Sequence, residues 1–245
     1  MESLVWISGA SGAIGQALVR TVPWPATRVI GISRSPTPGA IHLEADLSDP
    51  SGWDAVGASF GKELAGFPGG RVVLVHAAGT VDPIGFAGEV DTESYRVNVV
   101  LNSAAPQVLG HLFLDAASSV RGPRHLVMLT SGAARSVYPG WSSYGAGKAA
   151  VDQWVRDVGA EQVLRSGDGG VQVVSVGPGT VDTGMQAQLR AATEHDFPNR
   201  QKFVDLWSTG KLADPEDVAR GIWDLLDRGL PNGSVIDLRD LADPG

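Results

Sequence analysis

Short apolar runs that alternate with longer helical stretches constrain the fold of this chain more than any other feature. Residues 72–75 read VVLV and residues 126–129 read LVML. Strands that are apolar at every position, rather than at every second one, are typical of a parallel sheet covered by helices on both faces. The pattern therefore predicts an α/β fold built on a buried parallel sheet.

Seven strands and five helices are predicted from this alternation. The strands are expected at residues 4–8, 28–33, 40–44, 71–76, 125–130, 171–176 and 234–238, and the helices at 12–21, 50–64, 92–119, 142–165 and 215–228. Asp214 and Pro215 are typical of the N-cap and the first position of the last helix. Right-handed crossovers between the strands give a Rossmann-type doubly wound sheet in three α/β/α layers.

The 245 residues are expected to form a single domain, since α/β domains of this length are common. The stretch from Gly177 to Leu212, after the sixth expected strand, breaks the alternation. Ligands bind at the carboxyl ends of the strands in such sheets, so an insertion at about residues 180–212 suggests a substrate loop or lid. An ordinary helical excursion is the alternative.

Composition excludes several classes of function. The net charge of -8 argues against nucleic acid as a partner, and the absence of cysteine excludes disulfides and thiolate metal ligands. We expect no metal site. The first residues lack the basic start and long apolar run of a signal peptide, and we expect no segment of about 20 apolar residues that spans a membrane. A cytoplasmic protein without a membrane partner is predicted.

A glycine-rich turn, SGASGAIG, follows the first expected strand and opens the first helix. Glycines let the backbone turn sharply and approach a pyrophosphate, whose charge a helix N-terminus favours. This position predicts dinucleotide binding, although any tight strand-to-helix turn uses glycine. The candidate cofactor residues here are Gly9, Ser11, Gly12, Ala13, Ile14 and Gly15.

Ser33 and Arg34 end the second expected strand, and no acidic residue lies between Glu2 and Glu44. Folds that select NAD place a carboxylate near this point, whereas a cation accommodates the extra phosphate of NADP. The sequence therefore favours NADP (NADPH) over NAD. The alternative is that Arg34 is a solvated loop cation.

Tyr144 and Lys148 lie four residues apart in an expected helix, so their side chains share one face. A cation beside a phenol favours the phenolate, which lowers the pKa of the tyrosine and lets it give a proton to a developing alkoxide. Ser131 follows the fifth strand, thirteen residues before Tyr144, at the sheet edge where ligands bind. Taken singly, these residues are also typical of a surface helix pair and a turn-capping serine.

Together the motifs resemble the short-chain dehydrogenase/reductase family over essentially the whole chain. They occur in the family's order: the glycine turn, Asp46-Leu47, HAAG at residues 76–79, Asn98, Ser131, Tyr144, Lys148 and PGTVDT at residues 178–183. The resemblance implies hydride transfer between a nicotinamide cofactor and a C=O or CH-OH group.

The resemblance also implies roles for individual residues. Tyr144 is the expected general acid in carbonyl reduction, and Ser131 the residue that hydrogen-bonds the substrate carbonyl. Lys148 is expected to lower the tyrosine pKa and hold the nicotinamide ribose, and Asn98 to support a water relay to Lys148. The remaining cofactor contacts are expected from Ser33, Arg34, Asp46 at the adenine, Leu47, Ala77, Ala78, Gly79, Pro178, Gly179, Val181, and Thr183 at the carboxamide.

Two departures from the family pattern stand out. Ala13 occupies a position where short members usually carry glycine, although the thirteen-residue gap from Ser131 to Tyr144 is typical of the short branch. His76 and Ala77 stand where the family usually has two asparagines. We expect His76 to be a hydrogen-bonded core residue rather than a catalytic one.

Three segments are similar to those of sepiapterin reductases: residues 139–153, residues 178–190 and the C-terminal NGSVIDLRD. In those enzymes an aspartate of the last strand anchors the pterin, and Asp237 is the matching residue here. A carboxylate can accept paired hydrogen bonds from an amino-substituted ring, between flat aromatic walls. The expected substrate residues are Ser131, Tyr138, Trp141, Met185, Trp207 and Asp237; the alternative is a turn-capping aspartate and core aromatics.

Relatives with these features also reduce α-diketones such as benzil, so the resemblance implies an NADPH-dependent reductase of a ketone or vicinal dicarbonyl. An NAD-dependent alcohol dehydrogenase of the same family is the first alternative. A dinucleotide-sensing regulator is the second, which the presence of both Tyr144 and Lys148 disfavours. The two longest expected helices resemble the family's dimer-forming pair and predict a homodimer or homotetramer.

Overall fold

The computed structural model describes residues 2–242, and the seven expected strands form one sheet. Neighbouring strands are parallel throughout, in the order β3-β2-β1-β4-β5-β6-β7. This is the predicted doubly wound sheet, and each strand lies within one residue of its expected bounds. The strands are β1 (Ser3–Ser8), β2 (Thr27–Ser33), β3 (Ile41–Glu44), β4 (Arg71–His76), β5 (Arg124–Leu129), β6 (Gln172–Gly177) and β7 (Val235–Asp237).

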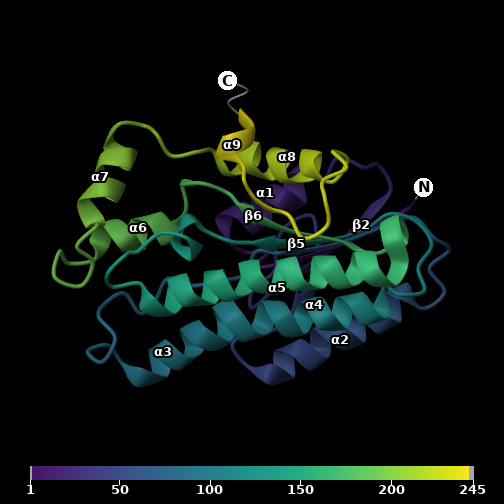
Figure 1. Cartoon of the computed structure of the whole chain (residues 1–245), viewed down its shortest axis with the longest axis horizontal. Coiled ribbons are helices and arrows are strands. Elements are labelled where there is room, and N and C mark those ends of the chain that lie inside the picture. Colours follow the sequence, from purple (N-terminus) through teal and green to yellow (C-terminus); the bar gives the residue numbers. More distant parts are fainter. Residues whose placement is uncertain (1, 243–245) are drawn as a thin grey trace.

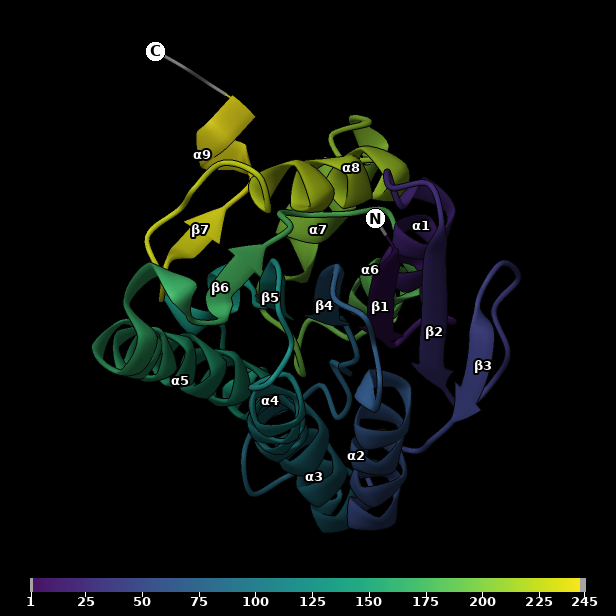
Figure 2. The same ribbon diagram turned by 90° about the vertical axis from the view of Figure 1, so that its right-hand side faces the viewer.

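Helices cover both faces of the sheet, with α2, α4 and α5 on one side and α1 and α8 on the other (Figure 2). The helices are α1 (Ala13–Thr21), α2 (Pro50–Leu64), α3 (Thr92–Val99), α4 (Ala105–Ala116), α5 (Ser142–Ser166), α6 (Gly184–Ala191), α7 (Arg200–Ser208), α8 (Pro215–Leu225) and α9 (Arg239–Ala242). The predicted three layers are therefore present.

Strand β4 shows why the sheet strands are apolar at every position. Val72 and Leu74 belong to the core under α2, α4 and α5, whereas Val73 and Val75 belong to the core under α1 and α8. All four side chains are fully buried. Successive side chains of a strand point to opposite faces, so a sheet covered twice needs apolar residues on both.

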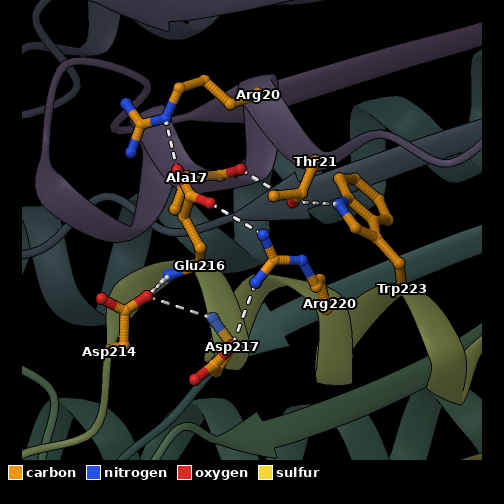
Figure 3. Close-up of polar contacts among 8 residues, drawn as sticks. All are labelled: Ala17, Arg20, Thr21, Asp214, Glu216, Asp217, Arg220 and Trp223. Carbon is orange, nitrogen blue, oxygen red and sulfur yellow. Dashed lines mark hydrogen bonds and ion pairs between the residues drawn. The ribbon is translucent and has the colours of Figure 1, made fainter.

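Helices α1 and α8 are joined by polar contacts as well as by the core (Figure 3). The indole nitrogen of Trp223 donates to Thr21 Oγ1 over 3.2 Å, and Arg20 pairs with Glu216 over 2.9 Å. Asp214 accepts a hydrogen bond from the backbone nitrogen of Glu216 over 2.7 Å, with Pro215 at the first helical position. The N-cap predicted for this helix is confirmed.

The long helix predicted at residues 92–119 runs from Thr92 to Ala116 and contains one π-helical turn, Val100–Ala104, between α3 and α4. By length and composition alone this helix could cross a membrane. Here Leu109 and Phe113 are fully buried in the core beneath the sheet, which accounts for its apolar character. A π-turn shifts the helix face by one residue and often marks a functional site.

The residues between β6 and α8 form the short helices α6 and α7, which lie together at one end of the molecule (Figure 1). Phe197 and Phe203 from this segment are buried in a third apolar cluster with Trp141 and Tyr144. The stretch expected as a loop insertion is therefore largely helical, and it packs against the beginning of α5. Its action as a lid stays a prediction.

Candidate active site

Ser131, Tyr144 and Lys148 converge beyond the carboxyl end of β5. Ser131 follows this strand and caps a short 3-10 turn, accepting a hydrogen bond from the backbone nitrogen of Ala133 over 3.2 Å. Tyr144 and Lys148 lie one turn apart at the start of α5, and each is 6% exposed. The structure thus brings together the three residues that the sequence singled out.

The Tyr144 phenol is held neutral by its surroundings. Burial raises the pKa of Tyr144, and the hydrogen bond from Ser131 opposes that rise. The Lys148 ammonium lies 5.8 Å from the centre of the tyrosine ring. We expected the lysine to lower the tyrosine pKa; in this structure burial is the largest influence, and Ser131 rather than Lys148 opposes it. The raised pKa keeps the phenol protonated, and proton donation from it then depends on a cation that stabilises the phenolate.

Lys148 is buried, and a backbone carbonyl holds its ammonium in place. Its Nζ donates to the carbonyl oxygen of Leu129 over 3.0 Å. Burial lowers the pKa of Lys148 to about 8, and the nearby charge of Asp152 opposes this shift. Asp152 is itself buried and accepts from Ser175 Oγ over 2.7 Å. Asp152 was not predicted from the sequence; its position four residues after Lys148 on the same helix is the signal that indicates it.

Asn102, rather than Asn98, lies beside Lys148. A Cβ at Gly79 would meet Asn102 Oδ1 at 2.8 Å and Lys148 Nζ at 3.6 Å, so both groups border the same glycine. Asn98 lies one turn earlier, where it donates to the carbonyl of Asp82 over 2.7 Å and accepts from Asn102 Nδ2 over 3.0 Å. The sequence pointed to Asn98 alone; the π-turn that carries Asn102 has no evident sequence signal.

His76 is buried as expected, but only one of its two ring nitrogens has a hydrogen-bond partner among the described residues. Ser8 Oγ accepts from the backbone nitrogens of Ala77 and Ala78 over 3.1 and 3.2 Å, so its own proton is free for His76 Nδ1, 3.0 Å away. The histidine proton then resides on Nε2, for which residues 2–242 supply no partner. Burial and the charge of Lys148 lower the pKa of His76 to about 3.

The turn after β1 has the shape that a dinucleotide requires. Gly9 has a φ of 65°, and a Cβ there would meet the backbone of Ala78 at 2.8 Å. Gly12 caps α1 without a side-chain hydrogen bond, so the first backbone N–H groups of α1 can accept an anion. With Gly79 open beside Lys148, these residues fit a nicotinamide dinucleotide that runs from the glycine turn to Tyr144.

Arg34 and Asp46 lie at the same edge, after β2 and β3. Both are exposed, and the charge of Arg34 contributes to a lowered pKa of Asp46, whose main cause is the hydrogen bonds from Ser48. Ser33 Oγ donates to the Ser35 carbonyl over 2.6 Å. Leu47, also predicted as a cofactor residue, has its side chain buried in the core.

The loop after β6 reaches the same edge. Gly179 has a φ of 77°, and Val181 is buried and bridged to Ala213. Thr183 caps α6 and accepts from the backbone nitrogen of Gln186 over 3.4 Å. Its hydroxyl proton is therefore not used by this cap.

The expected aromatic walls are present in part. Trp141 lies 5.0 Å from Tyr144 and 5.5 Å from Tyr138 between ring centres, and Met185 packs against the same cluster. Trp207 differs from the expectation: it is 56% exposed and stacks on the guanidinium of Arg190 at 5.1 Å. It belongs to the last turn of α7, where its neighbour is α6 rather than Trp141.

Asp237 also differs from the expectation. Its carboxylate is 4% exposed, and Arg239 donates to both oxygens, from Nε over 2.8 Å and from a terminal nitrogen over 2.6 Å. Arg135 lies 3.8 Å away as a second ion-pair partner. The hydrogen-bonding capacity that we assigned to a substrate ring is therefore used within the chain itself.

Comparison with known proteins agrees with this geometry. The family model described as short chain dehydrogenase matches residues 3–194. The chain belongs to this family. Its members are oxidoreductases that act on carbonyl and alcohol groups with a nicotinamide dinucleotide, so the oxidoreductase class expected from the motifs is confirmed.

Individual relatives refine this assignment. The chain is 32% identical over 238 residues to a benzil reductase ((S)-benzoin forming) of Bacillus subtilis, covering 96% of this chain and 97% of the relative. It is 32% identical to the sepiapterin reductase of Rattus norvegicus over 175 residues, which cover 70% of this chain and 64% of that enzyme. A short chain dehydrogenase/reductase from Saccharomyces cerevisiae has the same fold, with a TM-score of 0.82 at 22% identity and 99% and 97% coverage.

The burial of His76 predicts a specific dependence of stability on pH. The unfolded chain takes up a proton at His76 below about pH 6.5, whereas the folded chain does so only near pH 3, so stability falls as pH decreases between these values. His76→Asn removes this contribution. Urea denaturation between pH 6 and pH 4 should show a slope shallower by about 1.4 kcal/mol per pH unit than in the parent.

The matched control is His111→Asn, since His111 is exposed on α4. His125 remains in both variants and keeps part of the pH dependence, because burial lowers its pKa to about 4. An unchanged slope in His76→Asn would show that His76 is charged in the folded protein.

Proposed function

We propose that this enzyme uses NADPH to reduce a ketone or vicinal dicarbonyl, with Tyr144 as general acid. The observation that carries the proposal is the buried phenol of Tyr144. It is hydrogen-bonded to Ser131, and its ring centre lies 5.8 Å from the ammonium nitrogen of Lys148. The benzil reductase of Bacillus subtilis, similar over nearly its whole length, supports a diketone as the substrate class.

Ser131 and Tyr144 perform the proton chemistry. The cofactor supplies the hydride when bound. Ser131 Oγ accepts from Ala133, and its own proton, which is directed at Tyr144 here, can be donated to the carbonyl oxygen of a bound substrate. Tyr144 then transfers its phenolic proton to that oxygen as negative charge develops there. Donors that are ordered before the reaction make this charge less costly than it is in solution.

Lys148 stabilises the phenolate that remains on Tyr144. The Leu129 carbonyl fixes the ammonium, and a pKa near 8 keeps it charged at neutral pH yet close to exchanging its proton. We assign the relay that restores the proton to Asn102, whose amide borders Gly79 together with Lys148. Asn98 supports this relay indirectly, because it accepts a hydrogen bond from the Asn102 amide.

The preference for NADPH is supported by the end of β2. Arg34 is exposed there, and the sequence has no carboxylate between Glu2 and Glu44 to bind the ribose hydroxyls that distinguish NAD. Asp46, which follows β3 at the same edge, is already hydrogen-bonded to Ser48. A guanidinium is well matched to a phosphate at this position.

A homodimer or homotetramer in the cytoplasm is part of the same proposal. Val97 and Val99 on the helix before the π-turn are 36% and 42% exposed, and Val163 and Leu164 near the end of α5 are 51% and 86% exposed. Association would remove these apolar side chains from water.

Replacing Tyr144 tests the general acid. Tyr144→Phe should lower kcat for reduction of benzil with NADPH by about a hundredfold to ten-thousandfold, because the proton donor is lost. Binding of NADPH, followed by fluorescence, should persist. Tyr95→Phe is the control, since Tyr95 bonds only weakly to Ser142 over 3.3 Å. A Tyr144→Phe enzyme as fast as its parent would refute the assignment, and a parent that binds NADPH without turnover would favour the sensing alternative.

Replacing Arg34 tests the cofactor choice. Arg34→Ala should lower kcat/KM for NADPH by about tenfold to a hundredfold, as expected for one charge-assisted contact, and change the value for NADH little. Arg28→Ala is the control, because Arg28 pairs with Glu63 at the other end of β2. Equal use of NADH and NADPH by the parent, unaffected in Arg34→Ala, would support the NAD-dependent alcohol dehydrogenase instead.

The two asparagines can be separated in the same assay. Asn102→Ala should lower kcat more than Asn98→Ala, because only the first change removes the amide beside Lys148. Thermal unfolding of both variants provides the control for folding. The reverse order of kcat values would return the relay to Asn98, the residue that the sequence indicated.

A further inference from the structure

Two arginines are held at the edge of the site by one buried carboxylate. Asp237 ends β7, and besides its two bonds to the Arg239 guanidinium it accepts from the Arg239 backbone nitrogen over 3.1 Å. Arg135 approaches the same carboxylate to 3.8 Å. A carboxylate that is 4% exposed thereby fixes two side chains that are 44% and 65% exposed. The carboxylate thus orients two guanidiniums that remain open to solvent.

Both guanidiniums keep donors for a ligand. A guanidinium has five N–H donors, and Arg239 uses Nε and one terminal nitrogen on Asp237. Within residues 2–242, Asp237 is the one carboxylate paired with Arg135, at a separation longer than a hydrogen bond. The two side chains can therefore present further N–H groups to an anion from outside the chain.

The arginines lie next to the reacting groups. Arg135 directly follows the 3-10 turn that Ser131 caps. The side chain of Arg239 covers Gly179, where a Cβ would meet Arg239 Cδ at 3.2 Å, in the loop expected to hold the nicotinamide. Tyr138 is near enough to Arg239 to influence its charge, and Trp141 links Tyr138 to Tyr144. The pair thus borders the substrate side of the site.

A third cation lies near the two arginines, although the chain as a whole carries -8. Lys202 Nζ donates to the Tyr138 hydroxyl over 2.7 Å, and Tyr138 lies near enough to Arg239 to affect its pKa. Two acids, Asp237 and Asp240, also act on Arg239.

We propose that Arg135 and Arg239 bind a carboxylate of the substrate, so that the preferred substrate is an oxo acid. The carboxylate of this oxo acid is a different group from the carbonyl that Ser131 and Tyr144 hold. It binds where the sequence had predicted an amino-substituted ring bound to Asp237. The planar guanidiniums match a carboxylate in geometry as well as charge. This inference rests on the proposed reductase function and specifies the substrate class of the same site.

A pair of substrates that differ only in charge tests the proposal. Benzil 4-carboxylate and its methyl ester are each assayed with NADPH. The parent should favour the acid, and Arg135→Gln should lower the ratio of the acid and ester kcat/KM values about tenfold to a hundredfold, mainly through the KM of the acid. Raising the ionic strength should lower the same ratio in the parent.

A second variant guards against misfolding. Arg239→Gln alone would leave the buried Asp237 carboxylate short of its main partner, so the double variant Asp237→Asn/Arg239→Gln removes both charges together. This double variant should lower the ratio of the acid and ester kcat/KM values, as Arg135→Gln does. Arg220→Gln is the matched control for Arg135→Gln: it removes one positive charge as that variant does, on the α8 surface where Arg220 pairs with Glu216 and Asp217 (Figure 3). Its ratio should equal that of the parent.

The outcomes separate this inference from the proposed function. The parent could reduce the acid and the ester with equal kcat/KM, and Arg135→Gln could change both values equally. That result would overturn the carboxylate site and leave the proposed reductase function unaffected. A raised KM for NADPH in Arg135→Gln with an unchanged ratio would assign the arginines to a cofactor phosphate and overturn it too. The parent could also reduce neither compound but bind the acid in calorimetry, with binding lost in Arg135→Gln. That result would support the carboxylate site and contradict the proposed diketone reductase.

Discussion

Parallel pairing of β4 with β1 and β5 is the constraint on which the site depends. Because these strands run in one direction, their carboxyl ends meet at one edge and bring distant segments together. The Ser8 hydroxyl holds the backbone after β4, and the end of β5 supplies both the carbonyl that fixes Lys148 and the turn that carries Ser131. The sheet can impose this order because both of its faces are covered by apolar cores.

Burial of titratable groups gives the site its electrostatic character. Tyr144, Lys148 and His76 are all nearly inaccessible, and desolvation is the main cause of each pKa shift. For each group the shift favours the uncharged form. A neutral phenol can donate a proton, and a lysine near its pKa can exchange one at little cost. Asp152, behind Lys148, moderates the cost of keeping that ammonium inside the protein.

The outer part of the site departs more from its expected pattern than the inner part does. The hydroxyl of Ser131 and the phenol of Tyr144 meet as the motif predicts, because strand ends and helix starts fix them. Asp237 instead has Arg239 two residues away, and that arginine occupies both of its oxygens. The oxygens that the sequence assigned to a substrate ring are thus occupied by a neighbouring side chain of the same segment.

The sequence by itself determined the doubly wound sheet, its strand bounds to within one residue and the trio Ser131, Tyr144 and Lys148, but not the short helices α6, α7 and α9. These follow from local rules: apolar runs, helical spacing and the order of short motifs. Tertiary structure alone decided that Asn102 borders Lys148, that Trp207 faces solvent and Arg190, and that Asp237 is paired with arginines. The π-turn, the packing of α7 on α6 and the ion pair depend on side-chain contacts that form only in the folded chain. Local sequence patterns do not specify such contacts.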